Sequence, residues 1–332
     1  MNPRVHGGPD AQGAARWDFS SNANACGPCP AALAAVQQAD ATRYPDPAYT
    51  RLRAALADLH GVDPARVLPV ASASEAIQRF TAWRWRAGDR TFWVPPHAYG
   101  DYAHAATAWG LQPAADAAEA ALAWLCDPGS PLGQGESVDV VRTLLTGAPR
   151  TVVLDRAYAP LRWRGRSALD ETQLQRVWQL WSPNKALGLT GVRAAYAIAP
   201  LGARGDVAAL ESLAPSWPLG AHGEAMLMAW TQRETQDWVA DSRQTLATWA
   251  AELRTVLQEH GWVVAPSDTP YGCAQPPRPL DAAFLRTQGI KLRDARSFGL
   301  PGWWRLSAQA PEALAALGAA LQALDFREEA SP

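Results

Sequence analysis

Segments with strand-like and helix-like patterns alternate along most of the sequence. Short apolar runs, which suit buried strands, occur at residues 66–70, 91–94, 121–126, 151–154, 177–181 and 192–198. Stretches between them repeat apolar residues at helical spacing, as at residues 49–60, 74–85, 99–109 and 138–145. Strands that alternate with helices are typical of a mostly parallel sheet covered on both faces. The sequence therefore predicts an α/β fold built on such a sheet.

The length of 332 residues is too great for one small core and predicts more than one lobe. We expect an irregular N-terminal arm at residues 1–40, a large domain at 41–215 and a smaller α+β domain at 216–332. The last part begins near Pro215 and contains a long helix that ends at His260-Gly261. Short strands follow, and Pro311 opens a final helix.

Charge and hydropathy argue against several classes of partner. The net charge is −2 and no basic block occurs, so we expect neither nucleic acid nor anionic membrane as a partner. No stretch of about 18 apolar residues predicts a membrane span. The polar, glycine-rich start at residues 1–17 lacks the apolar core of a signal peptide, which favours the cytoplasm.

Two of the four cysteines spell the redox sequence Cys26-Gly-Pro-Cys29. Redox proteins of the thioredoxin type place this sequence after a strand, but residues 20–25 have no apolar strand pattern. A redox role is therefore disfavoured. No second Cys/His pair lies at zinc-ligand spacing, and we expect no metal site.

Lys185 is one of only two lysines, the other being Lys291. It has a serine three residues before it, Ser182, and an arginine eight residues after it, Arg193. This spacing suits a lysine that forms a Schiff base with pyridoxal 5'-phosphate (PLP), since the hydroxyl and the forked guanidinium can both reach the cofactor's phosphate. The alternative is that a composition biased to arginine has left one lysine on a loop.

A carboxylate must keep the pyridine nitrogen of PLP protonated. Asp155 follows the apolar run 151–154, and Tyr158 could donate to the ring's phenolic oxygen. Ligands of parallel sheets bind beyond the carboxyl ends of the strands. Asp127, Asp155 and Ser182 each follow an apolar run, so we expect them to gather at one sheet edge. A role for Asp155 as a helix cap or turn residue stays open.

Further candidates for PLP binding lie at the starts of helices. The amides of Ala73 and Ser74 and the Ser74 hydroxyl suit a phosphate, because helix N-termini bind anions. Capping alone would also explain Ser74. Tyr99 could stack on the ring, with Tyr102 and His97 as competitors.

The substrate requires a second kind of cation. Arg305 is a charge inside the apolar strand 303–306, and a buried arginine needs an anionic partner such as a substrate carboxylate. Arg293 and Arg296 lie on the preceding segment and could receive a second anion, although a surface position is preferred for Arg296.

Together these residues resemble the fold-type-I PLP-dependent enzymes of the histidinol-phosphate aminotransferase group. Asp155-Arg-Ala-Tyr158 and the Ser182, Lys185 and Arg193 spacing match that group's motifs. The segment 42–47 resembles one whose tyrosine, here Tyr44, reaches into the partner subunit's site. The resemblance implies the aspartate aminotransferase fold, PLP as cofactor and a homodimer with a shared active site.

Within this group the chain is most similar to the threonine-phosphate decarboxylases of the cobalamin pathway. The likeness rests on His6-Gly7-Gly8 and on the segments 18–20, 22–24, 292–294 and 297–301. It implies a lyase that decarboxylates L-threonine O-3-phosphate to (R)-1-amino-2-propanol O-2-phosphate. Arg305 would hold the carboxylate, and Arg293 and His6, with Asn24 nearby and Tyr44 of the other subunit, would bind the phosphate.

Two other readings stay open. One is a histidinol-phosphate or related class I/II aminotransferase, and the other is a PLP-fold binding protein without turnover. The chain also departs from the group at three places, one of which is the strand end Val70-Ala71-Ser72, where the group is glycine-rich. Ser130 stands where a second asparagine contacts the phenolic oxygen of PLP, and serine is shorter. Arg156 stands where a glutamate is usual.

Overall fold

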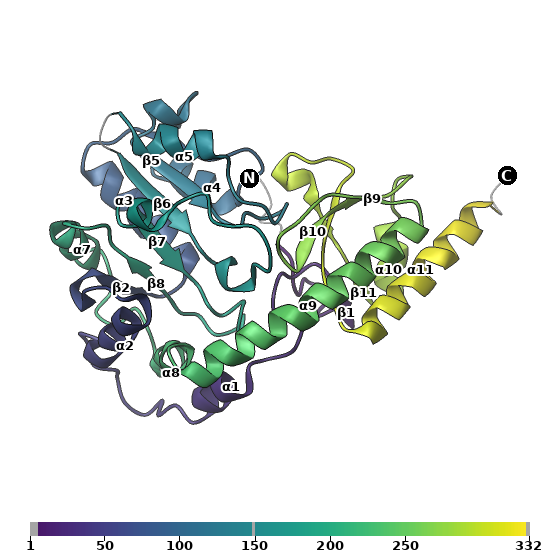
Figure 1. Ribbon diagram of the computed structural model, residues 1–332, viewed down its shortest axis with the longest axis horizontal. Helices are drawn as coiled ribbons and strands as arrows, with labels where there is room; N and C mark the ends of the chain where they lie inside the picture. The colour runs from purple at the N-terminus through teal and green to yellow at the C-terminus, as the bar shows by residue number, and fades with distance from the viewer. Residues whose placement is uncertain (1–5, 148–149, 330–332) are drawn as a thin grey trace.

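The computed structural model describes residues 6–147 and 150–329. The molecule has two lobes (Figure 1). A large domain contains a seven-stranded sheet, and a smaller domain contains a four-stranded sheet. Helix α9 (Arg233–Glu259) runs along both lobes and ends beside the sequence His260-Gly261, as predicted.

The large sheet has the strand order β2-β8-β7-β6-β5-β3-β4. Its strands are β2 (Val67–Val70), β3 (Thr91–Trp93), β4 (Gln112–Pro113), β5 (Leu122–Cys126), β6 (Thr151–Asp155), β7 (Trp178–Trp181) and β8 (Ala195–Ile198). β8 runs antiparallel to both of its neighbours, and the pairs among β7, β6, β5, β3 and β4 are parallel. The predicted α/β fold with a mostly parallel sheet is confirmed.

Helices cover both faces of this sheet. They are α1 (Pro30–Gln37), α2 (Thr50–His60), α3 (Ala73–Arg86), α4 (Gly100–Ala108), α5 (Val138–Leu145), α6 (Glu171–Leu174), α7 (Arg204–Glu211) and α8 (Ala221–Trp230). Single turns of 3-10 helix lie at η1 (Pro64–Arg66), η2 (Ala117–Glu119), η3 (Ala159–Leu161) and η4 (Ala295–Phe298).

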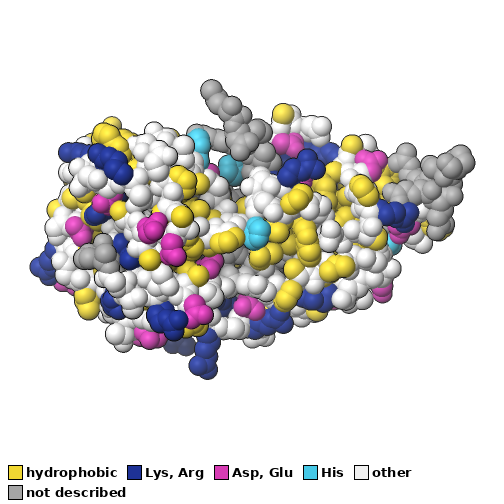
Figure 2. Space-filling view, turned by 90° about the horizontal axis from the view of Figure 1, so that it is seen from above, with side chains coloured by type: hydrophobic (Ala, Val, Ile, Leu, Met, Phe, Trp, Pro, Cys, Tyr) yellow, Lys and Arg dark blue, Asp and Glu magenta, His cyan; other side chains and the backbone are white. Residues whose placement is uncertain are grey.

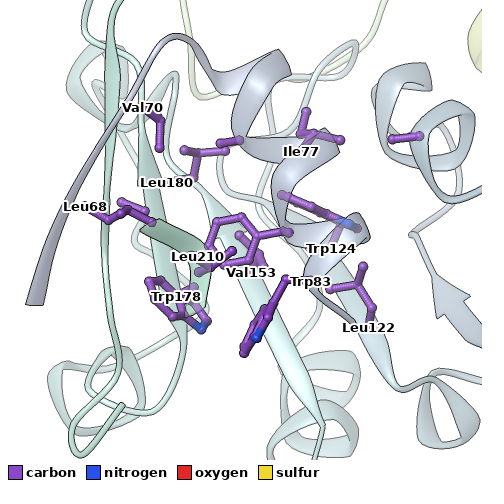
Figure 3. Close-up of a cluster of buried hydrophobic side chains, with 14 of the residues drawn as sticks. Leu68, Val70, Ile77, Trp83, Leu122, Trp124, Val153, Trp178, Leu180 and Leu210 are labelled. Atoms are coloured by element: carbon purple, nitrogen blue, oxygen red, sulfur yellow. The ribbon is translucent and has the colours of Figure 1, made fainter. Parts of the chain in front are cut away.

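Successive residues of the central strands pack into two separate hydrophobic cores, one on each face of the sheet. Trp124 and Val153 pack with Ile77 of α3 on one face, as Figure 3 shows. Their neighbours Leu125 and Leu154 pack on the opposite face against α5. Successive side chains of a strand point to opposite faces, so strands buried on both sides consist of continuous apolar residues. This explains why the runs in the sequence are unbroken, and each large side chain buried here contributes about 1.5–3 kcal/mol to folding.

The small domain has an antiparallel sheet of order β12-β13-β10-β9. Its strands are β9 (Val263–Val264), β10 (Tyr271–Gln275), β12 (Arg293–Asp294) and β13 (Trp304–Ser307), and its helices are α10 (Ala282–Thr287) and α11 (Pro311–Glu329). Leu314, Leu317 and Leu321 of α11 pack in its core, on the stripe expected from the sequence.

The expected division of the chain differs from the packing at one boundary. α8 buries Met226 and Leu227 in the core of the large domain, so this domain extends beyond residue 215. The boundary between the two domains lies within α9, because Leu246 packs with the large domain and Leu253 with the small one. In the N-terminal arm, whose residues 1–5 lie outside the described ranges, β1 (Trp17–Asp18) pairs in parallel with β11 (Ile290–Lys291).

Basic and acidic side chains are interspersed over the face seen in Figure 2. In residues 6–147 and 150–329, no helix is long and apolar enough to pass through a lipid bilayer. The same ranges contain no group of three or more histidine, cysteine, aspartate or glutamate residues placed to hold a metal ion.

Candidate active site

Lys185, Asp155 and Ser182 lie at or just beyond the carboxyl ends of two neighbouring parallel strands. Asp155 ends β6 and pairs with Cys126 at the end of β5 and with Leu180 of β7. Ser182 directly follows β7, and Lys185 lies in the turn after it. The predicted gathering at one sheet edge is therefore present, and the sheet topology produces it.

Lys185 lies over an aromatic ring from the loop after β6. Its Nζ is 5.3 Å from the centroid of the Tyr158 ring. Asp127, the other residue expected at this edge, directs its carboxylate to Arg162 and to the Ser167 hydroxyl at 2.6 Å. Asp127 therefore stabilises the loop that contains Arg162 and Ser167, whereas Lys185 and Tyr158 form the centre of the site.

Asp155 is a buried carboxylate held in place by hydrogen bonds. Its side chain accepts from the Tyr102 hydroxyl at 2.7 Å and from the Ala157 amide at 2.9 Å. Burial raises the pKa of Asp155, and the nearby Lys185 ammonium, the Tyr102 hydroxyl and the Ala157 amide each act to lower it. A cation placed against this carboxylate would favour its charged form, which is the environment that a protonated pyridine nitrogen provides.

Tyr102 is a functional residue that sequence reasoning placed in another role. It is fully buried and stacks on Trp124, with ring centroids 4.9 Å apart and planes 8° apart. Its hydroxyl is directed at Asp155, 53 residues away in sequence. Tyr102 therefore orients the carboxylate and is not available to stack on a cofactor ring.

Tyr99 and Ser74 meet at one acidic side chain. The Tyr99 hydroxyl donates to Asp101 Oδ2 at 2.6 Å, and the Ser74 hydroxyl donates to the same oxygen at 3.2 Å. The cap of α3 is Ser72, which accepts from the Glu75 amide at 3.0 Å. Ala73 and Ser74 therefore form the first turn of the helix, where backbone amides lack intrahelical partners and can bind an anion.

The Ser182 hydroxyl is a buried polar group of the site that lacks a hydrogen-bond partner in the described chain. An unsatisfied buried hydroxyl costs about 1–3 kcal/mol, which a phosphate oxygen would recover. Arg193, the predicted second phosphate ligand, has an exposed side chain.

Ser130 joins three parts of the chain. Its Oγ accepts from Arg305 Nη1 at 2.9 Å and lies 3.4 Å from Asn22 Nδ2. The same Asn22 amide lies 3.3 Å from the Tyr158 hydroxyl, and Asn22 Oδ1 is buried without a partner in the described chain. Asn22 was not among the predicted site residues, although it begins the segment 22–24 that supports the resemblance.

Asn24, which was nominated instead, is occupied elsewhere. Its Nδ2 donates to the Ala186 carbonyl at 3.0 Å and to Ser242 Oγ at 2.7 Å, and its Oδ1 accepts from the Cys26 amide at 3.0 Å. The backbone N–H of Asn24 also donates to the Lys185 carbonyl at 2.9 Å. Asn24 therefore fixes the backbone that carries Lys185, and its side chain does not join the group around Ser130.

Arg293 and Arg305 bring two cations together in the small domain. They are paired residues on β12 and β13 and are 5% and 7% exposed. Arg305 Nη2 donates to the Ser20 carbonyl at 2.5 Å, and Arg293 Nη2 donates to Ser297 Oγ at 2.6 Å. Burial, and then the charge of Arg305, lowers the pKa of Arg293. Arg296 is exposed, as preferred.

The two remaining predicted residues lie at the rim and on the surface. The His6 ring is 6.0 Å from the Tyr99 ring, which places the N-terminal arm beside the site. Tyr44 is 79% exposed and stacks on Trp217 at 4.4 Å, on the surface of the large domain. Tyr44 therefore contributes no contact to the group around Lys185 of its own chain.

The arrangement fits PLP by the chemistry of its donors. An amine lies near a buried, oriented carboxylate, and an unpaired hydroxyl follows the neighbouring strand. The first turn of α3 is linked to Tyr99 through Asp101. Arginines from the second lobe face the same region, where they can bind the anionic groups of a substrate. This set can hold a phosphorylated aldehyde and stabilise negative charge that develops on a bound amino acid.

Comparisons with known proteins show the family of the chain. The family model "Aminotransferase class I and II" matches residues 16–324. The histidinol-phosphate aminotransferase of Ruegeria pomeroyi is 30% identical, over 87% of this chain and 85% of its own.

Two solved structures show the same fold at lower identity. The histidinol-phosphate aminotransferase of Sinorhizobium meliloti, in complex with PLP, has a TM-score of 0.73 at 21% identity, with 92% and 90% of the chains covered. The L-threonine-O-3-phosphate decarboxylase of Porphyromonas gingivalis has a TM-score of 0.76 at 19% identity, with 93% and 99% covered. The chain thus belongs to the aminotransferase class I and II family of fold-type-I enzymes, which have the aspartate aminotransferase fold and depend on PLP.

Proposed function

We propose that the protein is a PLP-dependent lyase of cobalamin biosynthesis that decarboxylates L-threonine O-3-phosphate to (R)-1-amino-2-propanol O-2-phosphate. The observation that supports it most is the buried pair Arg293 and Arg305 at paired positions of β12 and β13. Arg305 Nε is buried without a hydrogen-bond partner in the described chain, and a substrate carboxylate could satisfy it. L-threonine O-3-phosphate carries such a carboxylate together with a phosphate, which the neighbouring Arg293 could bind.

The large domain would hold the cofactor. Lys185 would bind it covalently and Asp155 would face its pyridine nitrogen. Ser182, Arg193 and the first turn of α3, at Ala73 and Ser74, would bind its phosphate. The phenolic oxygen would lie near Tyr158, Ser130 and Asn22, and Tyr99 would lie against the ring. Bound PLP supplies an electron sink for the pair left behind when a bond to Cα breaks.

Arg305 would hold the substrate carboxylate, and its orientation decides which bond breaks. The Cα–carboxylate bond must stand perpendicular to the cofactor ring so that its electrons overlap the π system. Arg305 is fixed for this task by Ser130 Oγ at 2.9 Å and the Ser20 carbonyl at 2.5 Å. Lys185 would then donate a proton to Cα after carbon dioxide leaves. Arg293 and His6 would bind the substrate phosphate.

We also propose a homodimer in which each active site is shared. Tyr44 and Trp217 form a stacked pair that is 79% and 41% exposed. A large exposed aromatic pair of this kind suits a contact with a second chain. Tyr44 would then reach the substrate phosphate of its partner's site.

A second candidate is a histidinol-phosphate or other class I/II aminotransferase. It is favoured by the name of the Ruegeria pomeroyi relative at 30% identity. In that reaction the same site would break the Cα–H bond, and Lys185 would accept the proton. The two reactions differ in the bond that is held perpendicular to the ring.

Two assays on the purified protein separate these candidates. The decarboxylase releases carbon dioxide from L-threonine O-3-phosphate and leaves the cofactor in its aldehyde form. An aminotransferase converts the cofactor to its amine form with an amino donor such as histidinol phosphate, and a 2-oxo acid, which takes up the amino group, reverses the change. Amine formation without carbon dioxide release contradicts the decarboxylase. PLP binding with neither reaction contradicts both candidates.

A further inference from the structure

Lys291, the second lysine, lies between the N-terminal arm and the small domain. Its side chain is 15% exposed, and its Nζ donates to the Gly8 carbonyl at 2.5 Å and to Asp10 Oδ2 at 2.6 Å. Charge-assisted hydrogen bonds that are partly shielded from water are stronger than exposed ones. Lys291 therefore holds the arm at two residues, Gly8 and Asp10.

A second cation from the small domain binds the same carboxylate. Arg286 of α10 donates through Nη2 to Asp10 Oδ1 at 3.2 Å and to the Gly13 carbonyl at 2.8 Å. The hydrogen bond from Lys291 is the largest of the effects that hold the pKa of Asp10 below its ordinary value. Asp10 is thus the point where the arm is tied to the small domain.

The tied segment passes directly against the substrate arginine. A Cβ at Gly7 would lie 2.0 Å from the Ser20 carbonyl oxygen and 3.1 Å from Arg305 Nη2, so only glycine allows this approach. The Gly8 amide donates to Ser20 Oγ at 2.9 Å. The preceding residue, His6, lies beside Tyr99 with ring centroids 6.0 Å apart.

The backbone of Lys291 holds the same arm farther along. Lys291 pairs with Asp18 between β11 and β1, and its carbonyl accepts from the Phe19 amide at 2.9 Å. Two residues later the chain enters β12, where Arg293 faces Arg305. One short segment of the small domain therefore places both the arm and an arginine of the anion site.

We propose that Lys291 and Asp10 form a latch that holds residues 6–8 over the anion-binding end of the active site. Lys291 is then a positioning residue, since it acts through His6 and the arm and does not contact the reacting atoms. The inference rests on the proposed function for the identity of the substrate. Its structural part, the fixed arm, depends only on the contacts described above.

If the latch exists, variants that break it should weaken substrate binding, measured as KM, and leave the turnover number kcat almost unchanged. Lys291→Met removes the ammonium and keeps an unbranched side chain, and Asp10→Asn removes the charge that it binds. Both variants should raise KM for L-threonine O-3-phosphate about two- to fivefold, as expected for losing a charged hydrogen bond to an exposed carboxylate. kcat and the absorbance of the lysine-bound cofactor should stay within about twofold. Lys291→Arg should restore the wild-type KM.

The experiment also measures the arm itself, by hydrogen exchange of the peptide that covers residues 6–16 in the full-length protein. Faster exchange in Lys291→Met and Asp10→Asn supports the latch. The matched control is Asp139→Asn, which breaks an exposed ion pair with Arg142 on α5 and should change neither exchange nor KM. Unchanged arm exchange in both latch variants overturns the proposal, and so does faster exchange with an unchanged KM.

Failure of the latch and failure of the proposed function give different results. If the wild-type protein releases no carbon dioxide from L-threonine O-3-phosphate, the proposed function fails. The exchange rates of wild type and Lys291→Met then still decide whether the arm is latched. KM is measured in that case with the amino donor that the wild-type protein accepts.

Discussion

Arg293 and Arg305 lie directly opposite each other on β12 and β13, and both guanidinium carbons lie within 5.8 Å of the centroid of the Phe298 ring. Like charges placed opposite each other on neighbouring strands destabilise a sheet, and burial adds a desolvation cost. A pair retained at this cost suits a site that binds two anions. Phe298 offsets part of the cost, because an aromatic face attracts cations.

Replacing Arg305 should weaken substrate binding strongly. Arg305→Ala should cost about 2–5 kcal/mol in binding of L-threonine O-3-phosphate, as measured for a desolvated charge pair that loses one partner. Titration of the cofactor absorbance with substrate gives the dissociation constant. Arg296→Ala, on the exposed side of the preceding turn, is the control and should bind like wild type. Binding by Arg305→Ala within twofold of wild type would remove Arg305 from the substrate site.

Tyr102→Phe should change the acid limb of the pH profile. The variant keeps the stack on Trp124 and loses the hydroxyl that donates to Asp155 at 2.7 Å. A donor to a carboxylate favours its charged form, so the loss raises the pKa of Asp155 further. Asp155 would then become protonated at a higher pH than in the wild type. The pH below which kcat/KM falls should therefore be higher in the variant.

The control for this variant is Tyr49→Phe. It also removes a buried hydroxyl, but one that donates to the Leu219 carbonyl in the core of the large domain. An acid limb that moves equally in both variants, or in neither, contradicts the assigned role of Tyr102.

His60 should make the stability of the fold depend on pH. Burial, with a smaller effect from the charge of Arg156, lowers the pKa of His60 from 6.5 to about 4, and its Nε2 lies 2.8 Å from the Tyr196 hydroxyl. Because the folded pKa is lowered, the unfolded chain binds the proton first as pH falls. The stabilisation is complete above about pH 6.5 and is lost progressively toward about pH 4, at up to about 1.4 kcal/mol per pH unit.

The measurement is the free energy of unfolding in urea at pH 7.5 and 5.5 for wild type and His60→Gln. The advantage of wild type over the variant should shrink at the lower pH. An advantage that stays constant between the two pH values means that His60 is not the residue that titrates.

Much of the large domain could be read from the sequence because its strands are buried on both faces. The helix predicted at 138–145 has those bounds as α5, and the run 151–154 becomes β6 with one more residue, Asp155. One of the two inner strands of the small sheet, β10, was missed. Its sequence Tyr-Gly-Cys-Ala-Gln has no β-branched residue and small side chains at its centre, so no strand pattern is visible.

The site could be predicted in its residue types but not in every orientation. Lys185, Asp155 and Ser182 follow strand ends, and a parallel sheet brings such positions together. Asn22 and Asn24 lie two residues apart and are both buried. Which amide meets Ser130 and Tyr158 depends on contacts that span 108 and 136 residues. No local sequence pattern shows which asparagine makes these contacts. Likewise, no local pattern shows whether Tyr99 or Tyr102 donates to Asp155.

The central claim is that PLP is bound covalently by Lys185. With only two lysines in the chain, borohydride reduction followed by peptide mass mapping tests it directly. We predict the reduced phosphopyridoxyl group on the peptide that contains Lys185, and a Lys185→Ala variant that folds but retains no covalent cofactor. A label on the Lys291 peptide, or no label on a protein purified with PLP, would contradict the account.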